Sequence, residues 1–561
     1  MCNNQIIAKI FYEISEILSL KNVQWKPQAY NKAARVIDDL DKDVRDIYNE
    51  KGLKGLDEIP NVGKGIAKKI EEFLKTGKIK EFEKLKKSIP KGLTELMEVE
   101  GIGPKKAKQL YEKLKIKNIK DLERAVKKHK IQELERFGEK SEKDIEESIK
   151  NFKSRPKKRL LIGRVLPIAE HIIDELKQAD GVKQVIACGS LRRMYETIGD
   201  IDLLATSSNP KNIVDKFTKL KEVKRILAKG STKGMVLLDN NLQADIRVVN
   251  ENIFGSALQY FTGSKDHSIK LRGFAIKKGL KLSEYGLFDK NKRIACKTEE
   301  DIYKKLGMQF IPAELRENRG EIEVALNNKI PKLINYNEIK GDLHVHSNWS
   351  DGGNTIKEIV EAAKQLNYDY IGISDHSQTR KIANGLDKYE LEKQIKEIKK
   401  IRGIKVLAGS EVDILGDGSL DFNDNLLKKL DYVIAAIHSG FKQNVTKRIL
   451  NAMENKNVTI IAHPTGRLIE RRSECKLDFD EICRVARETN TLLEINAHQE
   501  RLDLRDELIK RAVENKVKLI INTDTHTIND LKFMKLGIGQ ARRGWATKKD
   551  IPNTENWDKF L

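Results

Sequence analysis

Residues 341–346, Gly-Asp-Leu-His-Val-His, end in two histidines, His344 and His346, that are separated by one residue. Alternate residues of a β-strand point to one face, so both imidazoles would enter the same cavity. Asp524 and His526 follow another apolar run in the same way. A barrel of parallel strands presents such residues together at its carboxyl end, so we expect a multinuclear metal site in an α/β barrel. Other apolar runs that end in a histidine or an acid are YIGISDH, KVLAGSE, YVIAAIH and VTIIAH.

This pattern resembles the PHP (polymerase and histidinol phosphatase) domain over residues 337–561. The resemblance implies a distorted barrel of about seven βα units around roughly three metal ions, and hydrolysis of phosphoesters. Asp351 stands where many relatives carry histidine, which favours Mn2+ at that position, although Mn2+ and Zn2+ both stay open for the cluster. The ligands that the resemblance assigns are His344, His346, Asp351, His376, Glu411, His438, His463, Asp524 and His526.

Two residues beside these motifs have open roles. His498, in Glu-Ile-Asn-Ala-His, either positions the substrate or is a surface histidine, with metal ligation as a less favoured third role. Arg467, in His-Pro-Thr-Gly-Arg, either binds the scissile phosphate or lies in solvent.

A second pair of acids, Asp200 and Asp202, lies in the run Gly-Asp-Ile-Asp at residues 199–202. On a strand both carboxylates would share one face, and carboxylates that close repel unless a cation joins them. Their place on an otherwise apolar strand predicts bound Mg2+ or Mn2+ together with substrate phosphates. Asp245, in Gln-Ala-Asp-Ile-Arg, supplies a third acid. Amides, a hydroxyl and a guanidinium for a triphosphate are expected from Gly189, Ser190 and Arg193.

Residues 254–264, Phe-Gly-Ser-Ala-Leu-Gln-Tyr-Phe-Thr-Gly-Ser, extend this pattern. With the acids and the Gly-Ser pair, they are similar to the nucleotidyltransferase palm and the thumb of the family X DNA polymerases, which include DNA polymerase β. The resemblance covers residues 1–316, and fusion of such a core to a PHP domain is the organisation of bacterial and archaeal family X polymerases. It implies that Tyr260 and Phe261 pack against the sugar of the incoming dNTP. It also implies that Gly263 lets the backbone approach the base and that Arg272 reaches the template minor groove.

One glycine pattern occurs twice in the amino-terminal third, at residues 60–70 and 99–110. In each copy an apolar residue and glycines precede a lysine-rich helix start. The glycines would form a tight hairpin, and the free helix amides would bind a phosphate without reading sequence. Two copies in a basic chain predict helix-hairpin-helix elements that hold DNA. The predicted contacts are Gly63, Gly65, Lys68, Gly101, Gly103 and Lys105.

Lys69 lies where, by the same resemblance, the family keeps a lyase nucleophile that attacks the sugar aldehyde of an abasic site. The amine must be neutral to attack, and we expect Lys64 and Lys68 to depress its pKa. A simple phosphate contact fits the sequence equally well. A 5'-deoxyribose-phosphate lyase is therefore one of two alternatives for Lys69.

The composition indicates an anionic partner. The chain carries a net charge of +22 with 34% charged residues, which argues against a purely metabolic phosphatase. Its five cysteines show no CxxC spacing, as expected in a reducing compartment. Its apolar runs have strand length and its start lacks a signal-peptide pattern, so we expect a cytoplasmic, nucleoid-associated protein. The expected partners are gapped or primer-template DNA and dNTPs, with no membrane, and the expected state is a monomer.

The sequence predicts a multidomain α+β and α/β protein that acts as a DNA polymerase filling short gaps in base excision repair. Its PHP domain would be a metal-dependent 3'-5' exonuclease or another 3'-end-processing activity. One alternative is an end-processing or abasic-site nuclease with weak polymerase activity. Another is a DNA-binding scaffold with degenerate sites, against which the intact acids and ligand set argue. The expected domains are 1–88 (helical, helix-hairpin-helix), 89–155 (fingers-like, second helix-hairpin-helix), 156–254 (palm), 255–316 (thumb), 317–336 (linker) and 337–561 (PHP).

Overall fold

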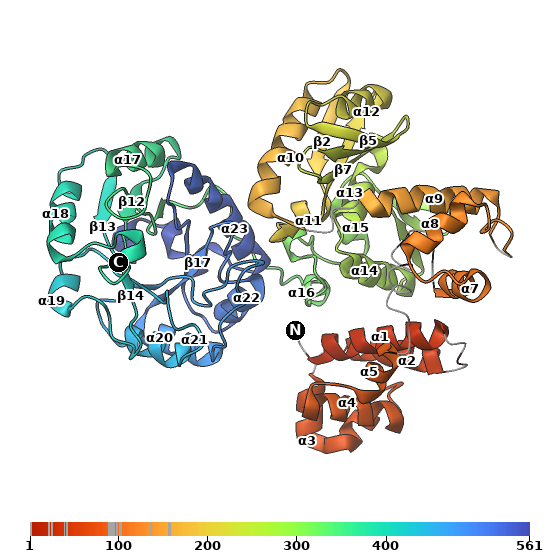
Figure 1. Cartoon of the computed structure of the whole chain (residues 1–561), viewed down its shortest axis with the longest axis horizontal. Coiled ribbons are helices and arrows are strands. Elements are labelled where there is room, and N and C mark those ends of the chain that lie inside the picture. Colours follow the sequence, from red (N-terminus) through yellow and green to blue (C-terminus); the bar gives the residue numbers. More distant parts are fainter. Residues whose placement is uncertain are drawn as a thin grey trace. The chain divides into compact units, whose positions relative to one another are not determined.

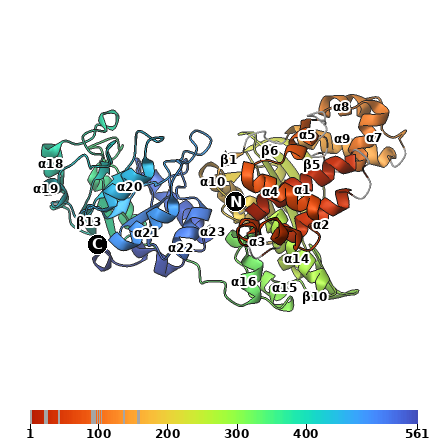
Figure 2. The same cartoon turned by 90° about the horizontal axis from the view of Figure 1, so that it is seen from below.

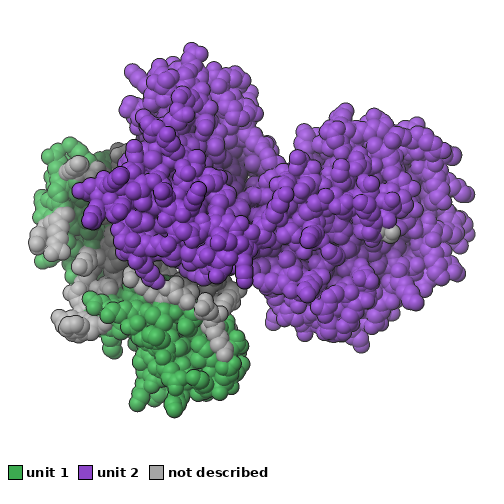
Figure 3. All heavy atoms as spheres, turned by 180° about the vertical axis from the view of Figure 1, so that it is seen from behind, with its two compact units in different colours: residues 1–155 green, residues 156–561 purple. Residues whose placement is uncertain are grey.

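The structure is a computed structural model that forms two compact units, residues 1–155 and 156–561 (Figure 3). The predicted DNA contacts Gly101 and Gly103 lie outside the described residues, as does the side chain of Lys105. The described residues are 3–20, 23, 26–38, 40, 43–87, 96, 99, 102, 104–134, 137–154 and 159–560.

The first unit is helical and has two separate hydrophobic cores, one within residues 7–82 and one within residues 96–149. Helix α4 (Lys64–Thr76) shows why these helices pack: its buried Ala67, Ile70 and Leu74 recur at helical spacing, while lysines cover the other face. The first core gathers α1 (Asn3–Leu20), α2 (Lys26–Asp38), α3 (Val44–Asp57), α4 and α5 (Lys80–Lys87), and the second gathers α7 (Pro104–Leu114), α8 (Ile119–Lys127) and α9 (Glu139–Ser154).

The second unit begins with a palm built on a five-stranded sheet of order β2-β4-β7-β6-β5, in which only β4 and β7 are parallel. Alternation along β4 sends Ile201 and Leu203 into the core under α10 and α12, and Leu204 toward α13 on the other face. The elements are α10 (Ile162–Lys177), β2 (Val182–Ala187), α11 (Gly189–Arg192), β4 (Asp200–Ser207), α12 (Pro210–Thr218), β5 (Val223–Lys229), β6 (Lys233–Leu238) and β7 (Gln243–Val249), with a small pair β1 (Leu160–Leu161) and β3 (Thr197–Ile198).

The thumb follows with its own core, and α14, α15 and β10 lie together in Figure 2. The predicted linker 317–336 differs from an extended connection. It contains α16 (Glu321–Leu326), whose apolar residues Ile322 and Ala325, one helical turn apart, are buried in the thumb core together with Leu333. The other elements are α13 (Phe254–Thr262), α14 (Lys265–Lys277), β8 (Leu280–Ser283), β9 (Gly286–Asp289), β10 (Lys292–Ala295), α15 (Glu299–Lys305) and the 3-10 helix η2 (Ala313–Leu315).

The remainder is a barrel of parallel strands surrounded by helices (Figure 1). Two sheets, β11-β12-β13 and β14 to β18 in order, join through isolated parallel bridges between Val345 and Thr525 and between His376 and Glu411. The strands are β11 (Gly341–Asp342), β12 (Tyr370–Ile373), β13 (Lys405–Ala408), β14 (Glu411–Asp413), β15 (Ile434–Ala436), β16 (Ile460–Ile461), β17 (Leu492–Asn496) and β18 (Leu519–Asn522). The helices are α17 (Ile356–Gln365), α18 (Lys388–Ile398), α19 (Asp424–Leu427), α20 (Val445–Met453), α21 (Phe479–Thr489), α22 (Asp506–Glu514) and α23 (Met534–Arg543).

Because β13 and β14 are two parts of one run of chain, broken only at residues 409–410, the barrel has the expected seven-stranded form. The parallel order places every strand's carboxyl end at one rim, where the predicted metal ligands follow the strands. The predicted fold class is confirmed. The unit boundary at residue 155 coincides with a predicted domain boundary, and the finer divisions stay predictions.

Candidate active sites

Glu411 lies at the centre of the barrel rim, 1% exposed. One of its carboxylate oxygens faces three imidazole nitrogens and the other faces two, at distances of 2.9–3.6 Å. Burial opposes its charge, but the histidines around it hold the pKa of Glu411 well below its usual range. The carboxylate is therefore ionised, and its two oxygens face two different groups of histidines. Its neighbours are His344, His346 and His376 at Oε2, and His438 and His463 at Oε1.

The other predicted ligands complete this cluster. Asp524 Oδ1 lies 3.6 Å from His344 Nε2 and 3.4 Å from His346 Nε2. Asp351 faces His526 Nε2 at 3.5 Å. The structure thus brings all nine predicted ligands together. Groups whose ligand atoms lie within 4.8 Å of one another are His346 with Asp351, His376 and His526; His344 with His346 and Glu411; and His376 with Glu411 and His438.

The histidines of this cluster are suited to bind metal ions, because several of their buried nitrogens lack a hydrogen-bond partner. Five buried imidazole nitrogens in this cavity have no hydrogen-bond partner among the described residues. An unpaired buried polar atom costs about 1–3 kcal/mol, which favours a bound ligand at these nitrogens. Burial, with the neighbouring histidines, lowers the pKa of His346 to about 3, and the neutral imidazole is the form that binds metals. The five atoms are Nε2 of His344, both nitrogens of His346, and Nδ1 of His376 and of His463.

Two carboxylates that the sequence analysis did not identify orient the ligands. Glu494 Oε1 accepts a 2.7 Å hydrogen bond from His344 Nδ1, and Asp413 Oδ1 accepts one of 2.5 Å from His438 Nδ1. With Nδ1 protonated, each ring turns Nε2 toward the cavity. The sequence contains an indication of Glu494, because an acid in the middle of an apolar strand such as β17 is buried and needs a buried partner.

The arginine beside the cluster is Arg501 rather than Arg467. Arg501 Nε lies 3.2 Å from Asp524 Oδ2, and its buried Nη1 has no hydrogen-bond partner within the described part of the chain. Arg467 is buried and donates to the carbonyl of Arg501, to that of Leu502 and to Glu196, so neither role considered for it from the sequence holds. It braces the loop that carries Arg501.

His498 packs edge-on against Phe533, with ring centroids 5.5 Å apart. It belongs to none of the ligand groups found among the described residues. Burial lowers the pKa of His498, whose side chain is half-buried, and its role toward the substrate stays a prediction.

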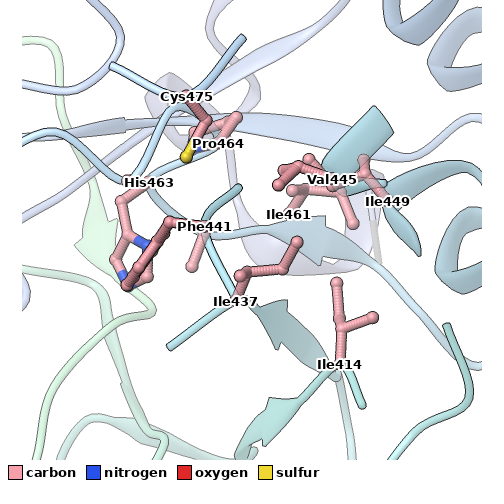
Figure 4. Close-up of a pocket in the computed structure, with 11 residues that line it drawn as sticks. Ile414, Ile437, Phe441, Val445, Ile449, Ile461, His463, Pro464 and Cys475 are labelled. Carbon is pink, nitrogen blue, oxygen red and sulfur yellow. The ribbon is translucent and has the colours of Figure 1, made fainter. Parts of the chain in front are cut away.

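A small apolar pocket adjoins His463, and Phe441 and Pro464 also line it (Figure 4). Burial, with Arg501 nearby, lowers the pKa of His463 to about 4, which keeps this ring neutral. The apolar lining fixes the ring and excludes water behind it. The lining residues are Ile414, Ile437, Phe441, Val445, Ile449, Ile461, Ala462, His463, Pro464, Gly466 and Cys475.

The palm acids meet at the start of the parallel pair β4 and β7. Asp202 and Asp245 are direct partners in the register, and Asp200 lies two residues before Asp202 on the same face. Burial, with the charges of Asp200 and Asp245, raises the pKa of Asp202 to about 7. A carboxylate so placed binds a proton or a divalent cation. Gln243 Nε2 donates to Asp245 Oδ1 at 3.1 Å and orients it.

Gly189 is required beside these acids. Its φ is +58°, and a Cβ atom there would lie 2.3 Å from Asp202 Oδ2. Any side chain would therefore displace the carboxylate. The Gly189 and Ser190 backbone thus lies against the acids, at the start of α11, and its role toward a triphosphate stays a prediction.

Arg193 lies where palm and thumb meet. Its Nη1 donates to the carbonyl of Thr262 at 2.5 Å, and a Cβ at Gly263 would lie 3.1 Å from the same nitrogen. Its Nε donates to Glu317 Oε1 at 3.0 Å. The predicted triphosphate arginine is therefore held by a carboxylate that sequence analysis placed in a linker.

The predicted sugar and minor-groove residues lie together on the thumb helices. The Tyr260 and Phe261 rings pack edge to face with centroids 5.2 Å apart. The Arg272 guanidinium lies 6.0 Å from the Tyr260 ring centroid, and its Nε donates to the Ser268 carbonyl at 3.1 Å. Their roles toward dNTP and template stay predictions.

In the first unit, the hairpin before α4 presents a bare helix start. Gly63 is the N-cap without a side-chain hydrogen bond, and a Cβ at Gly63 or Gly65 would meet nothing within 4 Å. Lys68 is exposed on the same helix. The left-handed residue of this hairpin is Asn61, with φ +63°, so the glycines leave the helix amides open rather than making the turn.

Lys69 differs from the expectation of a depressed pKa. Its Nζ lies 3.0 Å from Glu81 Oε2 and beside Tyr30. Burial opposes its charge, but hydrogen bonds to Glu81 and Tyr30 outweigh burial and raise the pKa of Lys69. An anionic partner, invisible in the local sequence, thus reverses the effect expected from Lys64 and Lys68.

Family models match five stretches of the chain. Models of the DNA polymerase beta palm and the DNA polymerase beta thumb match residues 164–257 and 257–317. The PHP domain matches residues 342–498. A helix-hairpin-helix domain and a SAM-like helix-hairpin-helix tandem match residues 2–79 and 93–151.

The chain is 38% identical over 562 residues to the DNA polymerase/3'-5' exonuclease PolX of Bacillus subtilis, across 98% of this chain and 97% of that protein. It is also 30% identical over 198 residues to a probable phosphatase of Clostridium acetobutylicum, covering 33% of this chain and 78% of the relative. A probable phosphatase of Thermoanaerobacter sp. is 29% identical over 231 residues, which cover 38% of this chain and 90% of that relative.

A polymerase β-like palm and thumb, preceded by helix-hairpin-helix elements and followed by a PHP barrel, define the family X DNA polymerases that carry a PHP domain. Within that class, the chain belongs to the PolX family. The predicted family is confirmed. None of the helices in the described ranges has the length and apolar character to span a membrane.

Proposed function

We propose that this chain is a DNA-directed DNA polymerase that fills short gaps during DNA repair, with a 3'-5' exonuclease in its PHP barrel. The observation that carries the polymerase is the direct pairing of Asp202 with Asp245, beside Asp200 and the side-chain-free backbone of Gly189. In this geometry, cations held by the three acids and the backbone amides of Gly189 and Ser190 could share the charge of a bound triphosphate.

In the palm, Asp200, Asp202 and Asp245 would hold two Mg2+ or Mn2+ ions. Bound there, such ions neutralise the triphosphate and stabilise the attacking and leaving oxygens. Gly189, Ser190 and Arg193 would orient the triphosphate, and Asp245 would lie nearest the primer 3'-hydroxyl. Tyr260 would stand against the dNTP sugar, where a ribose 2'-hydroxyl meets the ring.

In the barrel, the nine ligands would hold a cluster of Mn2+, Zn2+ or both. Such a cluster supplies an activated water and neutralises the phosphate in phosphoester hydrolysis. Arg501 would donate its unpaired Nη1 to the scissile phosphate, and the apolar pocket behind His463 keeps bulk water out. The products would be a shortened primer and a released 3' nucleotide.

In the first unit, the start of α4 would bind a DNA backbone phosphate through amides left open by Gly63 and Gly65, with Lys68 beside it. The raised pKa of Lys69 favours a phosphate contact over a lyase nucleophile, because a protonated amine cannot attack an aldehyde. We propose a monomer that takes gapped or primer-template DNA.

The test is a time course on a 5'-labelled primer in a one-nucleotide gap, with and without dNTPs, in Mg2+ or Mn2+. Asp200→Asn with Asp202→Asn should abolish extension and leave shortening, whereas His344→Ala with His346→Ala should do the reverse. Elemental analysis of the second variant should show metal loss. Equal loss of both activities in either variant contradicts the two-site proposal.

A further inference from the structure

We propose that Arg543, at the end of the PHP helix α23, sets the dNTP affinity of the polymerase palm through Glu317. The inference rests on the proposed role of Arg193 as a triphosphate ligand. It makes the barrel a positioning element for the polymerase, in addition to its own chemistry.

Two arginines share one carboxylate oxygen. Arg193 Nε lies 3.0 Å from Glu317 Oε1, and Arg543 Nη1 lies 2.9 Å from the same atom. The three side chains are 12%, 2% and 14% exposed for Arg193, Arg543 and Glu317. The network is therefore largely withdrawn from solvent, where the loss of one charge is not compensated by water.

Arg543 keeps its position independently of Arg193's side chain. Its Nη2 donates to Asp506 Oδ2 at 2.6 Å, and its guanidinium lies 4.8 Å from the Tyr195 ring centroid. Asp506 is also paired with Arg319 at 2.9 Å. Arg543 is thus fixed within the barrel edge and presents a constant positive charge to Glu317.

The backbone of the palm loop is held at the same place. Arg543 Nη1 donates to the Arg193 carbonyl at 2.9 Å, and a Cβ at Gly539 of α23 would lie 2.7 Å from Met194. The loop after α11 therefore rests directly on α23. A change at α23 therefore reaches Arg193, three residues after Ser190, through direct contacts.

Binding of a triphosphate requires Arg193 to exchange Glu317 for phosphate oxygens. A carboxylate left without a partner at this site would bear a desolvation cost, which would oppose the exchange. Arg543 keeps Glu317 paired while Arg193 leaves, so it lowers the cost of dNTP binding. By linkage, dNTP binding must strengthen the pairing of Arg543 with Glu317 by the same factor.

The experiment compares the full-length Arg543→Gln variant with the parent in single-nucleotide gap filling. We expect the KM for dNTP to rise about tenfold while kcat changes less than about twofold, since coupling between sites commonly amounts to about 5–150-fold. Equilibrium binding of a non-hydrolysable dNTP should weaken by the same factor. Adding Glu317→Gln should return the KM to the parent value or below it, because the competing carboxylate is then gone.

Lys535→Gln is the matched control. Lys535 lies on the same helix and pairs with Glu170 of the palm, but both side chains are about half exposed, and the ion pairs of Glu317 are with Arg193 and Arg543 instead. Its KM should equal that of the parent. Arg543→Lys, which keeps the charge, should stay close to the parent as well.

The outcomes separate the two proposals. If Arg193→Gln leaves KM unchanged, the role of Arg193 fails and this inference with it. If Arg193→Gln raises KM but Arg543→Gln does not, only the inference is overturned. Should Arg543→Gln not fold, Glu317→Gln alone decides: a lowered KM supports competition by Glu317, and a raised KM shows that Glu317 is only a structural brace.

Discussion

Glu494→Gln removes one charge from a buried carboxylate without changing its size, and the structure specifies what it disturbs. Oε1 accepts from His344 Nδ1 at 2.7 Å and from Asn522 Nδ2 at 3.1 Å. Oε2 accepts from the His463 amide at 2.7 Å and from Asn496 Nδ2 at 3.1 Å. Four donors thus converge on one carboxylate.

A glutamine amide nitrogen would face two donors whichever way it turns. If it replaces Oε2, the His463 amide and Asn496 lose their acceptor. If it replaces Oε1, it donates to His344 Nδ1 and moves that proton to Nε2, the atom that faces the metal cavity. Two buried hydrogen bonds lost at about 1–2 kcal/mol each give about 2–4 kcal/mol of destabilisation. Loss of such an orienting partner costs about 10–100-fold in metal affinity or activity.

The assay is metal content after dialysis against a graded series of chelator concentrations, together with Mn2+-dependent primer shortening. The chelator concentration that removes half of the bound metal should fall about 10–100-fold, while the rate of gap filling is unchanged. Glu488→Gln, at an exposed position on α21, removes the same charge and serves as control. A variant at Glu494 with parental metal retention and shortening would refute the orienting role.

Three further outcomes are expected. Tyr260→Ala should raise the ratio of ribonucleotide to deoxynucleotide incorporation, because the ring against the sugar is removed; an unchanged ratio, measured with matched rNTP and dNTP, assigns discrimination to another residue. Arg501→Gln should raise the KM for primer shortening about tenfold or more through loss of a charge-assisted phosphate contact, with metal content retained; metal loss instead would show that Arg501 mainly holds Asp524. Burial lowers the pKa of His267, and although burial opposes the charge of Glu321, the hydrogen bond between Glu321 and His267 lowers the pKa of that carboxyl. In both cases the unfolded chain binds protons more readily, so thumb stability should fall as pH drops below about 6.5. His267→Gln should flatten this pH dependence in denaturant titrations at pH 7.5 and 5.5.

The sequence predicts the parts of these sites that repeat at short spacing. His344 with His346, Asp200 with Asp202, and Asp524 with His526 are each two residues apart, so strand alternation alone places them on one face. The family resemblance extends this to the remaining ligands.

Partners distant in the chain are not predictable in this way. Glu494 orients a histidine 150 residues earlier, and Glu317 joins arginines 124 and 226 residues away. Lys69 shows the same limit, since local lysines suggested a depressed pKa and Glu81, brought alongside by α5, raises it. The segment after the thumb shows a related limit, because its apolar residues do not indicate in the sequence that they pack against the thumb core.

The two bridges that join the barrel's sheets are made by the ligand segments themselves. Val345 stands between two ligands and pairs with Thr525, which also stands between two, while the other bridge joins His376 to Glu411 directly. The seam of the cylinder and its metal cavity are therefore one set of residues. The hydrogen bonds that close this seam run between backbone groups. A lineage could therefore lose a ligand side chain, and with it a metal ion, while the cylinder stays closed.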